Sequence, residues 1–494
     1  MTTPRTLPAW FRQGSGCRLT AGEIDWDRED LVGASLEVAD RLRAEGLVAG
    51  DRVGWIGLND AWMIATLLAC ARAGMVLVPL NWRLAPEELA WIAADADLRL
   101  VFRGPGVASP RAWLPQSVAL VPADLSDIEL EALGGPQIGA GEEQAEAPLL
   151  LVYTSGTSGR PKGAVLTQSA VVANIRNAIG LFGLTPDDHI LTVLPMFHVG
   201  GLCIQTLPAL CAGGWVTLLP RFEPGAFFEA LDRDRPSLTL LVPAVMRALV
   251  QSQGWPEADL SCLRAVGAGS SQVPAELIEA FQSRGVPVQQ GYGATESGPI
   301  AIAQSIAEAW AAAGSIGRPI CEARVVAPDG TPLPQGLTGE IELRGPNLLS
   351  GYWGEQAAAA TSDEGWFRTG DVGHFDADGR WWFTDRLGNV IVSGGEHIYP
   401  AEVERVLATV PGVLEAAVCG RPDPKWGEVP VAVVVPGPGF DAAAVLSHFE
   451  GRLARFKQPR DVVAVASLPR NALGKVVLAE LRALAGGCRA TGGC

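Results

Sequence analysis

The sequence predicts an α/β fold, with a large N-terminal domain built on mostly parallel sheets and a small α+β domain at the C-terminus. Short apolar runs alternate with segments of helical periodicity through most of the chain, a pattern typical of parallel sheets covered by helices. The length of 494 residues exceeds what one hydrophobic core normally serves, so we expect at least two domains.

Composition narrows the class of protein. A net charge of −16 argues against a general binder of nucleic acid or of anionic membranes. The start of the chain lacks the apolar core of a signal peptide, and residues 63–80, interrupted by Arg72 and Gly74, indicate a core helix and a strand rather than a membrane span. Nine scattered cysteines without a Cys-x-x-Cys pair predict reduced thiols, no zinc-type site and a cytoplasmic location.

The first part of the chain alternates helix and strand. Residues 31–42 are periodic at helical spacing, and residues 52–56 and 76–80 have the composition of strands. Residues 149–152 form another apolar run, which predicts a buried strand. This strand leads into a stretch rich in glycine and hydroxyl residues.

That stretch, residues 153–164, is the main candidate for a phosphate-binding loop. Its glycines allow close approach of the backbone to a ligand, and its hydroxyls add hydrogen-bond donors, while Lys162 adds a positive charge. The hydroxyl residues are Thr154, Ser155, Thr157 and Ser158. It is not a P-loop, because Pro161 precedes the lysine and Gly163 follows it, and it lacks the dinucleotide fingerprint. On composition alone, an ordinary solvated loop is an equal alternative.

The middle of the chain carries two further motifs. After a predicted helix at residues 169–182, capped by Thr167 or Ser169, comes Phe197-His198, which is compatible with either core packing or a binding role. Later, Tyr292 stands between two glycines, so that its ring face is free to stack on a base. Glu296 offers a hard oxygen ligand suited to Mg²⁺.

The last third predicts a strand at residues 338–345, and then Asp371 after a Thr-Gly pair, well placed to bind a ribose diol. From Val390 the chain has the pattern of a small α+β domain. It contains the glycine turn 393–400, the segment 425–428 and the segment 468–475 near the end.

These motifs, in this order, resemble those of the adenylate-forming superfamily, which includes acyl-CoA synthetases, firefly luciferase and peptide-synthetase adenylation domains. The resemblance runs from about residue 30 to residue 480 and is strongest to bacterial fatty-acyl-CoA or 4-coumarate/feruloyl-CoA ligases. It implies an ATP-, Mg²⁺- and coenzyme A-dependent ligase. The carboxylate first attacks ATP to give acyl-AMP and pyrophosphate, and the thiol of coenzyme A then displaces AMP.

The resemblance also implies roles for individual residues. The catalytic residues are Lys475, Glu296 and His198, and the metal ligands are Glu296 and Thr154. Nucleotide contacts are expected from Thr154, Ser155, Gly156, Thr157, Ser158, Gly159, Lys162, Gly267, Ala268, Gly269, Tyr292, Gly293, Ala294, Thr295, Asp371 and Arg386. The acyl pocket is expected to comprise His198, Val199, Gly200, Gly291, Gly298 and Pro299, and the coenzyme A-facing residues Ser393, Gly394, Gly395 and Trp426.

The implied domains are residues 1–386 and 390–494, joined by a hinge at 387–389. Here Gly388 and Asn389 replace the charged residues usual in the family, which frees rotation at Gly388. A homodimer is an assembly that the sequence allows.

The substrate is predicted less directly. The family's amino-acid-activating members carry an Asp just after the position of His198, and this chain has none there. Gly291 and Gly298 suggest a deep, apolar pocket, unless they serve only the backbone. A phenylpropenoic acid, such as a coumarate or ferulate, or a medium to long fatty acid is therefore expected. The alternatives are a ligase that loads a carrier protein and a non-catalytic nucleotide-binding protein.

Overall fold

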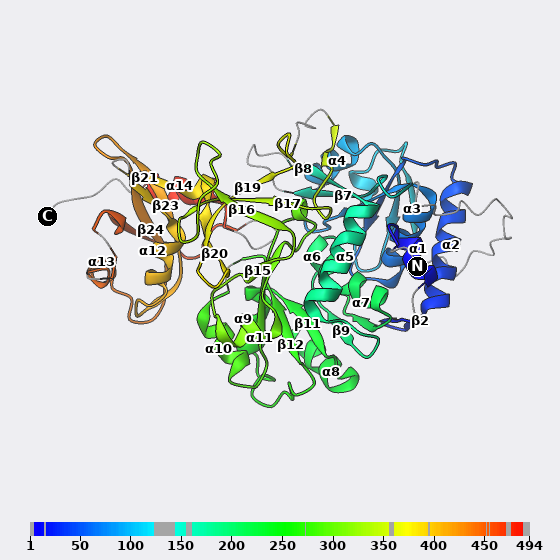
Figure 1. Cartoon of the computed structure of the whole chain (residues 1–494), viewed down its shortest axis with the longest axis horizontal. Helices are drawn as coiled ribbons and strands as arrows, with labels where there is room; N and C mark the ends of the chain where they lie inside the picture. Colours follow the sequence, from blue (N-terminus) through cyan, green and yellow to red (C-terminus); the bar gives the residue numbers. More distant parts are fainter. Residues whose placement is uncertain are drawn as a thin grey trace. The chain divides into compact units, whose positions relative to one another are not determined.

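The computed structural model describes residues 4–13, 16–122, 144–154, 161–271, 273–354, 360–393, 396–450, 452–453, 455–470 and 476–487. The chain divides into two compact units. Unit 1 comprises residues 1–323 and 343–367, and unit 2 comprises residues 324–342 and 368–494. The two units are shown in Figure 1 and are described separately below.

The first sheet of unit 1 runs in the order β18-β8-β7-β4-β3-β5-β6. Neighbouring strands from β7 to β6 are parallel, while β8 and β18 are added antiparallel at one edge. The strands are β3 (Arg52–Ile56), β4 (Val76–Leu80), β5 (Leu98–Arg103), β6 (Ala119–Pro122), β7 (Pro148–Thr154), β8 (Lys162–Thr167) and β18 (Gly351–Tyr352). The strands predicted at 52–56, 76–80 and 149–152 are confirmed as β3, β4 and β7.

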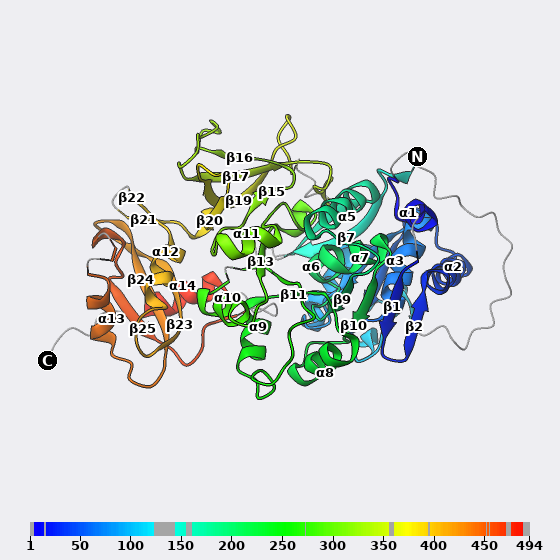
Figure 2. The same ribbon diagram turned by 60° about the horizontal axis from the view of Figure 1, so that its bottom comes forward.

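The second sheet of unit 1 runs in the order β15-β14-β13-β12-β11-β9-β10-β1-β2. Figure 2 shows β1 beside β2 and β10 at one end of this sheet. Its central strands, from β1 to β13, are parallel, and β2, β14 and β15 are antiparallel to their neighbours. The strands are β1 (Arg18–Ala21), β2 (Ile24–Asp27), β9 (His189–Thr192), β10 (Trp215–Leu218), β11 (Leu238–Leu241), β12 (Ala265–Ala268), β13 (Val288–Tyr292), β14 (Ile302–Ala303) and β15 (Arg318–Pro319).

The helices of unit 1 connect and cover these sheets. They are α1 (Leu7–Gln13), α2 (Arg28–Ala44), α3 (Ala61–Ala73), α4 (Pro86–Asp95), α5 (Gln168–Phe182), α6 (Val199–Gly201), α7 (Leu207–Ala212), α8 (Pro224–Asp234), α9 (Pro243–Val250), α10 (Ala275–Gln282) and α11 (Ile306–Ala311). Helix α5 begins as predicted, because the Thr167 side chain accepts a hydrogen bond from the backbone N–H of Ala170 at 3.2 Å.

Helix α3 explains how the two sheets share one core. It contacts β4 and β7 of the first sheet and β1 of the second, so it lies between them. Its side chains are accordingly apolar and buried on almost every face, which is typical of a helix enclosed on all sides. The Asp60 side chain caps its start, and Gly74, with φ of 69°, ends it.

Unit 2 contains the sheet β22-β21-β24-β23, with β25 paired to β24, and most of the sheet β16-β17-β19-β20. Its strands are β16 (Glu322–Val326), β17 (Gly339–Arg344), β19 (Phe367–Phe375), β20 (Trp381–Arg386), β21 (Ile391–Ser393), β22 (Glu396–Ile398), β23 (Val413–Asp423), β24 (Gly427–Pro436) and β25 (Asp461–Ala464). The helices are α12 (Pro400–Leu407), α13 (Ala442–His448) and α14 (Leu478–Gly487). Ile391, Val403 and Phe449 are among the buried residues that pack α12 and α13 against the sheet.

The division into compact units does not follow the predicted domain boundary. Residues 368–386 group with the C-terminal residues, and one reason is local: Asp385, at the end of β20, accepts a hydrogen bond from the backbone N–H of Ala401 in α12 at 2.7 Å. Compactness does not test rotation, so the hinge at 387–389 stays a prediction. Among the described residues, no helix combines the length and apolarity needed to cross a bilayer.

Candidate active site

The carboxyl ends of parallel strands in unit 1 bring the predicted site residues together. Thr154 is the last residue of β7, and Glu296 lies in a short 3₁₀ turn, Thr295–Ser297, just after β13. Although 142 residues separate them in sequence, the Thr154 hydroxyl lies 3.3 Å from Glu296 Oε1. The carboxyl ends of the strands are the usual position for ligands in an α/β protein.

Tyr352 of β18 joins this pair, and sequence reasoning missed it. Its hydroxyl donates to Glu296 Oε1 at 3.2 Å, and the Lys162 ammonium lies 5.5 Å from the centre of its ring. Burial, together with the negative charge of Glu296, raises the pKa of Tyr352 well above its usual range, so the phenol keeps its proton. The signal was present in the sequence: the chain has only four tyrosines, and this one follows a glycine as Tyr292 does.

The turn that carries Glu296 is held by backbone and side-chain hydrogen bonds. Asn347 Nδ2 donates to the carbonyl of Ser297 at 2.7 Å, and the N–H of Leu349 donates to the carbonyl of Glu296 at 2.9 Å. Gly298 has φ of +88°, and a Cβ there would lie 2.2 Å from the carbonyl oxygen of Asn347. A glycine is therefore needed at 298 for the backbone of the turn.

A side chain would clash with the backbone at Gly293 but not at Gly291. A Cβ on Gly293 would lie 2.0 Å from the carbonyl oxygen of Pro299, whereas one on Gly291 would make only ordinary contacts, the nearest being 3.4 Å from Ile300. Tyr292 lies between them at the end of β13 and is half-buried. Ala294 and Thr295 follow, so the predicted adenine segment leads directly into the turn that carries Glu296.

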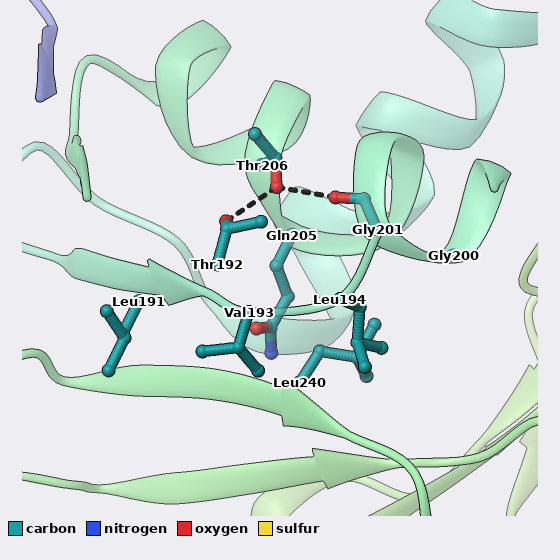
Figure 3. A pocket seen from close by; sticks show the side chains of 9 residues that line it. All are labelled: Leu191, Thr192, Val193, Leu194, Gly200, Gly201, Gln205, Thr206 and Leu240. Carbon is teal, nitrogen blue, oxygen red and sulfur yellow. Dashed lines mark hydrogen bonds between the residues drawn. The ribbon is translucent and has the colours of Figure 1, made fainter. Parts of the chain in front are cut away.

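The acyl-pocket segment follows β9. His198 precedes the short helix α6, and its ring centre is 4.7 Å from that of Phe197. Gly200 and Gly201, which follow closely in the sequence, line a small cavity of about 10 Å³, which Figure 3 shows with its lining residues. These come from β9 and the segment after it, from α6, from β11 and from a π-helical turn, Leu202–Thr206: they are Leu191, Thr192, Val193, Leu194, Gly200, Gly201, Gln205, Thr206 and Leu240. Val199, in α6, is buried.

Strand β12 lies beside the cavity-lining residue Gln205 and beside β13. A Cβ on Gly267 would lie 3.2 Å from Gln205 Nε2, and one on Gly269 would lie 2.7 Å from the carbonyl oxygen of Gly291. Ala268 ends β12, and the strand is parallel to β13. The structure thus brings the predicted nucleotide segment 267–269 beside the predicted acyl residue Gly291 and beside Gln205.

Unit 2 holds the remaining described site residues. Asp371 of β19 is 4% exposed and stands opposite Arg386 of β20, whose Nε lies 3.1 Å from Asp371 Oδ1. Ser393 is buried and pairs with Gly427, and Trp426 is 40% exposed with Lys425 Nζ 4.9 Å from its ring centre.

Several predicted residues are not part of the described structure. Ser155, Gly156, Thr157, Ser158 and Gly159 of the phosphate loop lie outside the described residues, as do Gly394, Gly395 and Lys475. Their roles stay predictions.

The oxygen atoms around Glu296 fit a magnesium ion. A carboxylate and a hydroxyl are hard ligands of the kind that Mg²⁺ prefers, and the Tyr352 phenol leaves the second carboxylate oxygen of Glu296 without a bond to it. Glu296 is half-buried, so the residue is not closed off from solvent.

Comparisons with known proteins agree with this arrangement. The family model "AMP-binding enzyme" matches residues 22–353, and "AMP-binding enzyme C-terminal domain" matches residues 402–475. The chain is 44% identical to an indoleacetate–CoA ligase of Aromatoleum aromaticum, with 97% of this chain and 98% of that protein covered. It is 40% identical to a feruloyl-CoA synthase of an Amycolatopsis species, with 90% and 91% covered.

A solved structure is similar over its whole length. The o-succinylbenzoate CoA synthetase of Bacillus subtilis, in complex with its acyl-adenylate intermediate, has a TM-score of 0.86 at 29% identity, with 96% of this chain and 97% of that chain covered. The chain therefore belongs to the family of AMP-binding enzymes, and it is an acid–thiol ligase that uses ATP, Mg²⁺ and coenzyme A to act on a carboxylic acid.

Proposed function

We propose that the enzyme activates an aromatic carboxylic acid, of the arylacetic or phenylpropenoic class, and transfers it to coenzyme A. The observation that carries the proposal is the lining of the cavity beside the predicted acyl residue Gly200, in which none of the nine residues is charged and Leu191, Val193, Leu194 and Leu240 form an apolar wall. An apolar wall favours an apolar acyl group, because burying that group removes its surface from water.

The same cavity argues against an acid with a second carboxylate. A second carboxylate, as in o-succinylbenzoate, would meet no cation among the lining residues, and burying it unpaired is costly. The indoleacetate and feruloyl specificities of the two relatives support an aromatic acid.

Each half-reaction is assigned to named groups. Glu296 and Thr154 would hold Mg²⁺, which would neutralise the phosphates as the carboxylate attacks. Tyr352 orients the Glu296 carboxylate, and Lys162 places positive charge beside it. Asp371 would bind the ribose, and Lys475 would reach the carboxylate during adenylation. Ser393 and Trp426 would face coenzyme A in the second step.

The test is a panel of acids with the purified full-length protein, ATP and Mg²⁺, with AMP and thioester measured by chromatography. Indole-3-acetate, 4-coumarate and ferulate should give thioester and AMP in equal amounts when coenzyme A is present, with Glu296→Gln as the inactive control. Preference for a dicarboxylate or for palmitate would contradict the aromatic assignment. If thioester forms only on a carrier protein, the acceptor is that protein and not free coenzyme A. If no acid leads to release of AMP, the result favours a non-catalytic protein.

The role of Lys475 has its own test. If Lys475 serves adenylation alone, Lys475→Ala should lose acyl-AMP formation by at least a hundredfold, yet convert supplied acyl-AMP to thioester at close to the normal rate. Equal loss in both half-reactions would show that the lysine is not confined to the first step. Lys457, another lysine of the C-terminal part of the chain, binds both carboxylate oxygens of Glu402 at 2.8 Å and offers the matched control Lys457→Ala.

A further inference from the structure

Gln205 is a buried amide without a partner. Its side chain is 2% exposed, and neither its oxygen nor its nitrogen makes a hydrogen bond to any residue that the structure describes. It belongs to the π-helical turn Leu202–Thr206, a distortion that is frequent at functional sites. In Figure 3 the amide extends toward Val193 and Leu240, at the apolar wall of the cavity.

The neighbouring polar groups do not serve this amide. The Thr206 hydroxyl donates to the carbonyl of Gly201 at 2.6 Å and lies 2.7 Å from the hydroxyl of Thr192, so these groups satisfy one another. A glutamine amide carries two donors and an acceptor, and leaving such groups buried and unpaired costs about 1–3 kcal/mol. A methionine of similar volume would fill a core position without this cost in free energy.

The position of the amide links it to the substrate. It lines the same cavity as Gly200 of the acyl segment, and a Cβ on Gly267 of β12 would lie only 3.2 Å from its nitrogen, so the glycine leaves the amide uncrowded. The cavity, about 10 Å³, admits one polar atom and excludes a ring. The amide is therefore placed to meet a single polar atom at the edge of a larger acyl group.

We propose that Gln205 is a specificity-determining residue that hydrogen-bonds a ring N–H or ring hydroxyl of the aromatic acid. This rests on the proposed function and narrows it: the substrate is an aromatic acid that carries such a polar atom, rather than a fully apolar one. A site built to pair a substrate N–H or O–H discriminates strongly against the analogue that lacks it, because its own polar group is then left unpaired.

The test compares acids that differ only at that atom. Indole-3-acetate is paired with benzothiophene-3-acetate, in which sulfur replaces the N–H, and 4-coumarate is paired with cinnamate. Each pair competes in one reaction, so the ratio of kcat/KM values does not depend on how much of the enzyme is folded. The wild-type enzyme should prefer the polar member of at least one pair by tenfold or more, and Gln205→Met should reduce that ratio to within twofold of unity.

Gln168→Met is the matched control, because Gln168 is also a buried glutamine with one unpaired atom but lies in α5, where it donates to the carbonyl of Ala71 at 2.9 Å. It should lower stability and leave both ratios unchanged. If aromatic acids are used but Gln205→Met keeps the wild-type ratios, the amide binds only water and the proposal for Gln205 is wrong while the proposed function stands. If no aromatic acid gives thioester and another class does, both are wrong.

Discussion

At the scale of single residues, the chemistry depends on how one carboxylate is held. Glu296 receives the Thr154 hydroxyl at 3.3 Å and the Tyr352 hydroxyl at 3.2 Å, both on Oε1. With that oxygen engaged, the carboxylate is fixed in orientation before an ion arrives. Removing a hydrogen bond that orients a metal ligand, as the Tyr352 hydroxyl does here, commonly changes metal affinity by ten- to a hundredfold.

Tyr352→Phe should therefore raise the Mg²⁺ concentration needed for half-maximal adenylation by about tenfold. Because the raised pKa keeps Tyr352 protonated, the hydroxyl donates throughout the neutral range and the effect should not depend on pH between 6 and 9. Tyr153→Phe is the control, since its hydroxyl also donates to a carboxylate, that of Asp95 at 2.5 Å, away from Glu296. An unchanged Mg²⁺ requirement in Tyr352→Phe would show that the phenol does not orient the metal ligand.

At the scale of elements, the turn after β13 separates two glycines that looked equivalent in the sequence. Gly298→Ala should destabilise the protein by about 1–3 kcal/mol, because the residue has φ of +88° and its Cβ would meet the carbonyl of Asn347. Gly291→Ala should cost less than about 1 kcal/mol, since its Cβ has ordinary contacts. Denaturant unfolding of the two variants measures this difference, and equal losses would contradict it.

The difference between Gly298 and Gly291 also determines at which of them a larger side chain can test the acyl pocket. Any change of acid preference in Gly298→Leu would be mixed with distortion of the turn that carries Glu296. Gly291→Ala leaves that turn intact, so a shift in its relative kcat/KM for long and short acids reports on the pocket itself.

Glu404 of helix α12 has a carboxyl group whose ionisation makes the stability of the protein depend on pH. Burial, reinforced by the charge of Asp385, raises the pKa of Glu404 to about 7, while a hydrogen bond from the N–H of Val418 opposes the shift. The unfolded chain ionises this group near pH 4.5, so folding retains a proton between those values. The stability contributed by the neutral carboxyl is complete below about pH 4.5 and is lost as pH rises toward 7.

Glu404→Gln should thus stabilise the protein at pH 8 by about 1–3 kcal/mol relative to the wild type and have little effect at pH 4.5. The neutral amide can still accept the hydrogen bond from Val418. Thermal unfolding at the two pH values measures the difference, with the exposed Glu450→Gln as the control. A gain of the same size at both pH values would mean that charge burial is not its origin.

At the scale of the whole molecule, the fold was predictable from periodicity, because β3, β4, β7, β11 and β12 are apolar runs of the expected length. The family of the chain was predictable from the order of its motifs. The sequence marked Tyr352 only as a rare residue type after a glycine and did not mark Gln205, because their positions beside Glu296 and Gly267 depend on residues distant in sequence. The structural demand on Gly298 was also invisible, because it arises from the backbone of Asn347.

The proposed hinge is the property of the whole molecule that most needs a test. Gly388 lies in a 3₁₀ turn, Leu387–Asn389, and a Cβ placed on it would meet nothing within 4 Å. Two hydrogen bonds span this point, since Asp385 accepts one from Ala401 at 2.7 Å and one from Asn389 Nδ2 at 3.2 Å, so a rotation at Gly388 would have to break the bond to Ala401. Gly388 itself is exposed and uncrowded, so its backbone can turn once that bond is broken.

Gly388→Pro should block rotation at this point, because the proline ring fixes φ and restricts the residue before it. Acyl-AMP should still form, since the first half-reaction needs one arrangement only, while thioester production should fall by at least tenfold. Gly388→Ala is the matched control: it adds a Cβ that touches nothing and leaves φ free, so both half-reactions should proceed at close to the normal rate. Single-turnover assays of each step with the same acid separate the two effects. Normal thioester turnover in Gly388→Pro would place the pivot at another residue, and equal loss of both steps would indicate a structural defect rather than a blocked rotation.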